Sequence, residues 1–275
     1  MAGSFLKGAP PTTVTGRVFT YTVGGRDADS IFAGIITDQA VTGSAPAASP
    51  TAIRKIGTGT WTLSGANTHT GSTTVAAGTL KIAAPGTITN SATTEVLSGG
   101  TLEMAGGSLA TGPVTISAGG TLKGFGAVKG PVTNNGLILG TAQGTPTITG
   151  NLTNHGTVRL SEGSTISVSG TFTNNGVLNL IGGSQTLPAN FVNNGVVMND
   201  TLLQPVHATL TNGVFTARIL SQNGFTYQLQ HRADLVSGNW QDVGIPVSGN
   251  GAVITLSQSM LAEADKGFYR IAIAP

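Results

Sequence analysis

Apolar and polar residues alternate at every second position through much of the chain, in short segments bounded by glycine. The pattern Gly-x-[aliphatic]-x-[apolar] recurs, for example in Gly78-Thr-Leu-Lys-Ile82 and Gly176-Val-Leu-Asn-Leu180. A period of two predicts β-strands, and no stretch shows the 3.6-residue period of an amphipathic helix. We therefore expect an all-β protein of short strands joined at tight glycine corners.

The strand pattern itself repeats at a nearly constant interval. The spacings between its corner glycines are 22, 20, 16, 20, 20 and 19 residues, at Gly78, Gly100, Gly120, Gly136, Gly156, Gly176 and Gly195. A looser strand lies between some of these corners, as at Thr145–Thr149 and Ser164–Ser169. About 20 residues per coil, with two or three strands each, predicts a parallel β-helix, that is, a solenoid. The crossover rule predicts that it is right-handed.

Equivalent positions of successive repeats form columns when the coils stack. We expect an interior aliphatic column two residues after each corner glycine, formed by Leu80, Leu102, Leu122, Ile138, Val158, Leu178 and Val197. The next position faces outward, and it holds Lys81, Glu103 and Lys123 on successive coils. These side chains would lie about 4.8 Å apart and partly offset one another's charge.

A second column consists of asparagine. Asn134, Asn154, Asn174 and Asn193 follow one another at spacings of 20, 20 and 19 residues. Asparagine tolerates left-handed corner geometry, and stacked side-chain amides can hydrogen-bond along a ladder. A structural Asn ladder is the favoured interpretation, and a binding role is the alternative.

The pattern divides the chain into three parts. Residues 1–52 are less regular and are expected to form N-terminal strands or a cap, with an excursion at 39–52 that is rich in Ala, Ser, Thr and Pro. Residues 53–205 form the predicted β-helix. Residues 206–275 contain Asn212-Gly213 between alternating segments, a strong hairpin signal, and are expected to form a small antiparallel β-sandwich.

One stretch of the chain reads Lys55-Ile-Gly-Thr-Gly-Thr-Trp-Thr-Leu-Ser-Gly-Ala-Asn-Thr-His-Thr-Gly-Ser-Thr-Thr-Val-Ala-Ala-Gly-Thr-Leu-Lys-Ile82. It closely resembles the autotransporter-associated β-strand repeat, also called the passenger-associated transport repeat. One departure is His69, where the family usually shows an aromatic residue such as Tyr. The resemblance implies an exported right-handed β-helix that belongs to an extracellular or cell-surface protein. It implies no chemistry by itself.

The C-terminal segments Tyr227–Trp240 and Gly267–Ile271 resemble the small β-sandwich modules near the ends of exported proteins in Verrucomicrobia-type bacteria. We expect the chain either to have a different architecture built with the same repeat or to be a fragment of a longer protein. Its first residues show neither the basic nor the apolar region of a signal peptide, so the export route is not visible.

Composition and charge narrow the possible functions. Hydrophobic residues make up 39% of the chain and charged residues only 9%, which favours a folded protein over a disordered one. Thirteen basic against eleven acidic residues give a net charge of +2, which argues against nucleic-acid binding. The chain contains no cysteine, so disulfides and thiolate metal sites are excluded. Its apolar stretches are too short for a membrane helix, and we expect no membrane insertion.

Candidate catalytic groups are sparse. The acids of the central coils are Glu95, Glu103 and Glu162, and no third acid joins the first two as a polysaccharide-cleaving site would require. Asp27 and Asp29 lack further calcium ligands and are expected to form a solvated turn.

The remaining candidates also point to structural roles. The histidines at positions 69, 155, 207 and 231 show no metal-binding spacing. Trp61 and Trp240 are expected in the cores rather than as sugar platforms. We therefore expect no catalytic residues, no metal and no cofactor.

These observations favour a non-enzymatic extracellular or cell-surface protein that serves as a stalk, an adhesin segment or a self-assembling fibre subunit. Solenoid ends leave unpaired strand edges, so end-to-end or strand-exchange association with a second copy is expected as one partnership. The alternative is a glycan-binding or polysaccharide-processing protein whose site lies in residues 39–52 or in the sandwich, with surface glycans as partners. Outward threonine ranks such as Thr79, Thr101 and Thr121 leave a lesser alternative of binding a crystalline polymer.

Overall fold

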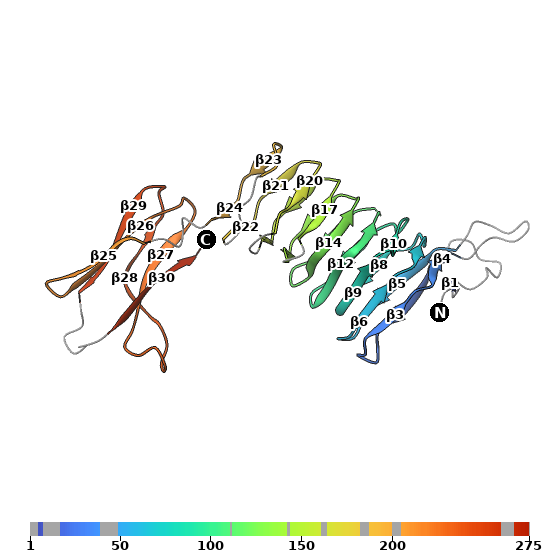
Figure 1. The fold of residues 1–275 in the computed structure, drawn as a ribbon, viewed down its shortest axis with the longest axis horizontal. Helices are drawn as coiled ribbons and strands as arrows, with labels where there is room; N and C mark the ends of the chain where they lie inside the picture. The colour runs from blue at the N-terminus through green and yellow to red at the C-terminus, as the bar shows by residue number, and fades with distance from the viewer. Residues whose placement is uncertain are drawn as a thin grey trace, which may run out of the picture. The chain divides into compact units, whose positions relative to one another are not determined.

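The computed structural model describes residues 5–7, 17–38, 49–110, 112–141, 144–160, 164–181, 187–199, 205–259 and 267–274. Within these ranges every regular element is a β-strand, which confirms the predicted all-β class (Figure 1). By its internal contacts the chain divides into residues 1–197 and 198–275. The second unit thus begins before residue 206, where the sequence pattern had placed its start.

The first unit is a parallel β-helix in which the strands of successive coils lie side by side, from blue β3 to yellow β24 in Figure 1. One long sheet consists of β2 (Phe19–Val23), β5 (Thr51–Lys55), β8 (Thr73–Val75), β11 (Thr94–Val96), β13 (Val114–Ile116), β15 (Val132–Asn134), β18 (Leu152–Asn154), β21 (Phe172–Asn174) and β23 (Phe191–Asn193). Every strand pairing that the structure describes within this sheet is parallel, as the repeat pattern predicted.

The second long sheet forms the opposite wall of each coil. Its main path runs through β3 (Ser30–Phe32), β6 (Thr60–Leu63), β9 (Gly78–Ala83), β12 (Gly100–Leu109), β14 (Thr121–Val128), β16 (Leu137–Leu139), β19 (Thr157–Arg159), β22 (Val177–Asn179) and β24 (Val196–Met198). The short strands β7 (Ala66–Asn67), β10 (Thr87–Ile88), β17 (Pro146–Ile148) and β20 (Ser167–Val168) pair beside this path. Strands β17 and β20 fall within the looser segments expected from the sequence.

The register of this sheet stacks equivalent residues of successive coils. Leu102 lies opposite Leu80 on one side and Leu122 on the other, and the same register continues through the later coils. The first six side chains of the aliphatic column are completely buried, namely Leu80, Leu102, Leu122, Ile138, Val158 and Leu178. Val197, the last, is partly buried against the same core. Burial of each such side chain is worth roughly 1.5–3 kcal/mol before chain entropy is subtracted, so this column organises the first unit.

The described part of residues 1–52 joins the coil stack. Strand β2 pairs with β5 and β3 pairs with β6, both in parallel. Strand β1 (Phe5–Lys7) pairs in parallel with β4 (Ile35–Thr37). Parallel pairing therefore begins within the segment that was expected to hold N-terminal strands or a cap. Most of the predicted excursion at 39–52 lies outside the described residues.

The 16-residue spacing between Gly120 and Gly136 has a structural cause. Strand β14 follows two partners without interruption, since Lys123 pairs with Leu139 of β16 and, three residues later, Gly126 pairs with Pro146 of β17. In the next coil Pro146 comes seven positions after Leu139. The four additional positions restore the 20-residue spacing.

The second unit consists of two antiparallel sheets that form a sandwich-like pair. One has the order β25 (Pro205–Thr211), β26 (Val214–Leu220), β29 (Val253–Ser259), and the other β28 (Gln241–Ser248), β27 (Thr226–Arg232), β30 (Phe268–Ala274). Asn212 and Gly213 join β25 to β26 with φ angles of 51° and 72°, as the hairpin signal predicted. Both sheets contribute to a buried core that includes Ala217, Ile219, Tyr227, Leu229, Ile254 and Leu256.

Candidate functional site

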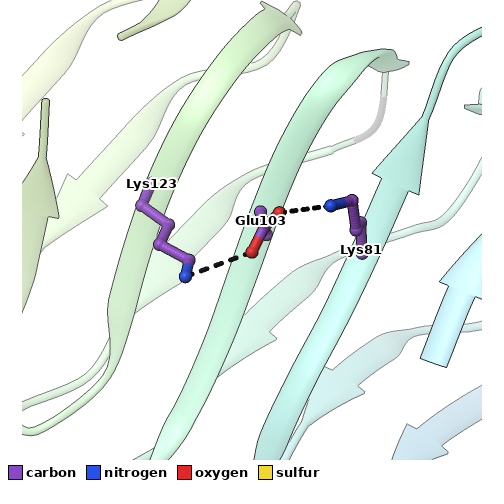
Figure 2. A network of polar contacts seen from close by, with 3 residues as sticks. All are labelled: Lys81, Glu103 and Lys123. Atoms are coloured by element: carbon purple, nitrogen blue, oxygen red, sulfur yellow. Dashed lines mark ion pairs between the residues drawn. The ribbon is translucent and has the colours of Figure 1, made fainter. Parts of the chain in front are cut away.

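The outward column of the β-helix carries a network of three charged side chains (Figure 2). Lys81 of β9, Glu103 of β12 and Lys123 of β14 lie opposite one another in the sheet register. The Lys81 Nζ atom is 2.7 Å from Glu103 Oε1, and the Lys123 Nζ atom is 3.1 Å from Glu103 Oε2. Each carboxylate oxygen therefore holds one ammonium group, and the three groups keep a net charge of +1.

The two lysines set the protonation of the carboxyl group between them. Partial burial alone would raise the pKa of Glu103, but hydrogen bonds and charges from Lys81 and Lys123 outweigh it and hold the pKa below its ordinary value. Glu103 is therefore ionised at neutral pH. Because the side chains are only partly shielded from water, each ion pair is worth at most about 1 kcal/mol.

A surface cavity of about 250 Å³ lies beside this network. It is lined by Lys81, Glu103, Met104, Ala105, Lys123, Gly124, Phe125 and Thr141. One side of its lining is thus charged, and Phe125 supplies an aromatic ring that is 40% exposed. The sequence analysis predicted the three charges as a column but did not predict the cavity.

Glycine residues allow the aromatic ring to lie at this position. A Cβ atom on Gly106 would stand 3.4 Å from Phe125 Cε2 and 3.2 Å from the Ala84 Cβ. Gly106 and Gly124 also have φ angles of 83° and 90°, which side-chain-bearing residues rarely adopt. Strand β14 continues without interruption through Gly124, Phe125 and Gly126.

The asparagine column lies inside the coils and forms a directed hydrogen-bond ladder. Asn134 Nδ2 donates to Asn154 Oδ1 at 2.6 Å, Asn154 Nδ2 to Asn174 Oδ1 at 2.7 Å, and Asn174 Nδ2 to Asn193 Oδ1 at 2.7 Å. The first three asparagines are completely buried. Each also donates to a backbone carbonyl of the next coil, those of Thr157, Val177 and Val196. The buried amide groups therefore have hydrogen-bond partners within the protein, and their burial does not require a ligand.

Lys55 occupies the same column near its other end, and the sequence analysis did not recognise it. Its residue exposure is 1%, and its Nζ atom donates to the carbonyl oxygens of Ile56, Gly57 and Ala77 at 2.7, 3.0 and 3.3 Å. Desolvation lowers its pKa, with nearby aspartates opposing the shift. A signal was present, because strand alternation places Lys55 on the inward face with Ile53.

His69 is also completely buried, in a polar cluster at a coil corner. Its Nε2 atom lies 2.9 Å from Thr73 Oγ1, which in turn lies 3.1 Å from Ser91 Oγ. Its Nδ1 atom has no hydrogen-bond partner among the described residues. Desolvation lowers the pKa of His69 to about 4, with the charge of Asp38 opposing the shift. The imidazole is therefore neutral at physiological pH.

Two of the other candidate acids make structural contacts. Asp27 Oδ1 accepts from the Thr58 amide at 2.7 Å, and Asp29 Oδ1 accepts from the Thr60 amide at 2.6 Å. The pair thus caps backbone amides of the following coil. Within the described residues no group of three or more His, Cys, Asp or Glu could hold a metal ion. Glu162 lies outside the described residues.

The two tryptophans differ in their surroundings. Trp61 is 7% exposed and belongs to the β-helix core, as the alternation of its strand predicted. Trp240 is only half-buried, and the Arg270 guanidinium carbon lies 4.5 Å from its ring centroid. The expectation of a core role for Trp240 was therefore wrong, because this residue precedes β28 and its ring stacks with a cation instead of entering the apolar core.

Comparison with protein families identifies part of this architecture. Residues 53–82 and 96–123 each match the model of the passenger-associated-transport-repeat, together about a fifth of the chain. The first match contains the stretch Lys55–Ile82 that resembles this repeat, and the second includes Glu103 and Lys123, which lie on successive coils. No curated protein and no solved structure matches the chain.

The repeats and the parallel coils fit a β-helix of the autotransporter-passenger kind, and this repeat family is non-catalytic. It is a family of secreted or surface passengers. Among the described residues no helix is long and apolar enough to cross a membrane.

Proposed function

We propose that this chain is a non-enzymatic structural segment of an extracellular or cell-surface protein, and that its β-helix acts as a stalk. The observation that carries the proposal is the unbroken stacking of interior columns through the coils. Such a stack makes a rigid rod whose stability grows with each nearest-neighbour contact. The passenger-associated repeats support an exported location.

The charged groups of the β-helix support the same proposal. Lys55, Asp27 and Asp29 bind backbone groups, and Glu103 binds two lysines. A hydrolase would instead keep a pair of carboxyl groups facing a substrate. Asp27, Asp29 and Glu103 thus bind groups of the coils themselves.

The location is tested with antibodies raised against the purified chain. They should label intact cells of the source organism or detect the protein in its culture medium. A signal that appears only after the cells are lysed would overturn the surface assignment. An antibody against a cytoplasmic protein serves as the control for cell integrity.

The stalk role is tested on the purified full chain in two measurements. Reducing-sugar release from a panel of polysaccharides should not exceed that of a boiled sample, and release above that level would replace the stalk with an enzyme. Light scattering across a concentration series, followed by electron microscopy, should show single rods. Filaments would instead identify a fibre subunit that associates through its terminal coils.

A further inference from the structure

We propose that the cavity beside Lys81, Glu103 and Lys123 binds a single carboxylated sugar residue, such as a hexuronic acid within an acidic glycan. This inference is independent of the proposed stalk role, since the cavity lies on the outer surface and the interior columns do not depend on it. A chain that failed to reach the cell surface would still bind the sugar in solution, so the two proposals fail separately.

The dimensions of the cavity limit the ligand to one ring. Sites for drug-sized molecules occupy roughly 300–1,000 Å³, and this cavity has about 250 Å³. It is partly open to solvent, so one residue of a longer glycan could enter it.

The charges in the lining favour an anion. Each lysine ammonium group has three N–H donors, and one contact from each is made to Glu103. The remaining donors of Lys81 and Lys123 are available to a second carboxylate, and the net charge of the three groups is +1. Lysine stems in neighbouring strands place the two ammonium groups on either side of Glu103 (Figure 2).

The apolar part of the lining favours a sugar over a simple anion. Phe125 exposes 40% of its surface while its ring is held over Gly106. The C–H face of a pyranose packs on an aromatic ring, whereas its hydroxyl groups require polar neighbours. Thr141 places such a neighbour at the loop side, where its hydroxyl donates to the Gly144 carbonyl oxygen at 3.1 Å. A carboxylated pyranose matches both halves of the lining.

The effect of Glu103 on affinity distinguishes this proposal from binding by a nonspecific basic surface. The Glu103 carboxylate already pairs with both lysines, so it competes with the ligand for the same donors. Neutralising it in Glu103→Gln should strengthen binding of an acidic sugar, whereas removing either lysine charge should weaken it. A nonspecific basic surface would respond weakly to all three changes.

The test is a titration of the full chain with sodium glucuronate, followed by NMR chemical shifts, with glucose as the neutral probe. Binding to one shallow site is expected in the millimolar range. We expect Lys123→Gln and Phe125→Ala to weaken it at least about fivefold, which corresponds to about 1 kcal/mol. Glu103→Gln should tighten it at least about threefold, and added salt should weaken it.

Arg159→Gln is the matched control. Arg159 lies two coils beyond Lys123 in the same outward column, so this substitution removes the same charge as Lys123→Gln but away from the cavity. Its affinity should stay within about twofold of the unmodified chain. Three results would overturn the proposal: no saturable shift at roughly tens of millimolar glucuronate, equal binding of glucose, or equal weakening by Arg159→Gln. Circular dichroism of each variant verifies that the coils remain folded.

Discussion

The β-helix contains two kinds of coil that differ in one interior column and in the corner that follows it. In the earlier coils this column holds Val75, Val96 and Ile116, and from Asn134 onward it holds asparagine. The sheet register passes through the change without a shift, since Ile116 lies directly opposite Asn134. The stacking of a coil therefore tolerates both kinds of side chain, and the difference between them lies in how each coil closes its corner.

The corner is longer where the column is aliphatic. Five positions separate Ile116 from Thr121, the start of the next strand, and the turn is closed by a bond from the Gly120 amide to the Ser117 carbonyl oxygen at 2.8 Å. In the later coils only three positions separate Asn134 from Leu137. There the asparagine side chain supplies hydrogen bonds that the longer backbone turn supplies in the earlier coils. At the change from Ile116 to Asn134 the corner thus becomes two residues shorter.

Asn154→Leu should have the largest effect on this comparison. Leucine would leave a buried Asn134 amide hydrogen and the Asn174 Oδ1 atom without their ladder partners. Each unsatisfied buried group costs about 1–3 kcal/mol, so we expect a loss of about 4 kcal/mol in the free energy of unfolding, measured by denaturant titration. Asn193→Leu, at the exposed end of the ladder, removes only one partner of Asn174 at a place that water can reach, and should cost about 1 kcal/mol. Equal losses at both positions would contradict the ladder as a source of stability.

Acid should affect the earlier coils first, because His69 lies there and the asparagine amides do not titrate. The folded-state pKa of His69, about 4, lies below the ordinary value of 6.5, so the unfolded chain binds the proton more readily. Stability should fall as the pH decreases from about 6.5 to 4, by on the order of 3 kcal/mol, and then level off. His69→Phe should flatten this interval in denaturant titrations at several pH values. An unchanged pH profile in this variant would assign the acid sensitivity to other groups.

Gly156 and Gly99, one from each kind of coil, should differ by a smaller margin in how well they tolerate alanine. A Cβ atom on Gly156 would overlap the carbonyl oxygen of Gly136 in the preceding coil, whereas one on Gly99 would meet no atom within 4 Å. Gly99 has a φ angle of 78°, so its replacement costs only backbone strain of about 1–2 kcal/mol. We expect Gly156→Ala to lower the melting temperature more than Gly99→Ala does. The reverse order would show that close approach between coils is not what requires glycine in the asparagine coils.

Glu103→Gln should produce the smallest change. The two ion pairs are partly exposed, and we expect a loss of about 0.5–1 kcal/mol at low salt. This loss should shrink toward zero in about 1 M salt, where the Debye length is near 3 Å. A loss that does not depend on salt would mean that Glu103 acts through packing rather than charge.

The interior of the β-helix could be predicted from its sequence because the column from Leu80 to Val197 is aliphatic in every coil. Alternation around Leu80 and Leu102 defined the interior, and the period of 20 residues defined the stacking. Strand alternation places Lys55 on the inward face, but its burial was missed because the ammonium group depends on carbonyl groups of two coils, including that of Ala77, which alternation alone does not reveal. The cavity was missed for a related reason, since it requires Phe125 to fold over Gly106 of the preceding coil.

The directed asparagine ladder also bears on how such a chain changes in length. The two inner rungs, Asn154 and Asn174, each accept from the asparagine of the preceding coil and donate to that of the following coil, and the rungs at Asn134, Asn154 and Asn174 are 20 residues apart. A tandem duplication of one such segment in the gene would insert a rung that fits both neighbours without any compensating substitution. The ladder thereby makes whole coils the natural unit of evolutionary gain and loss, and partial duplications would break the register.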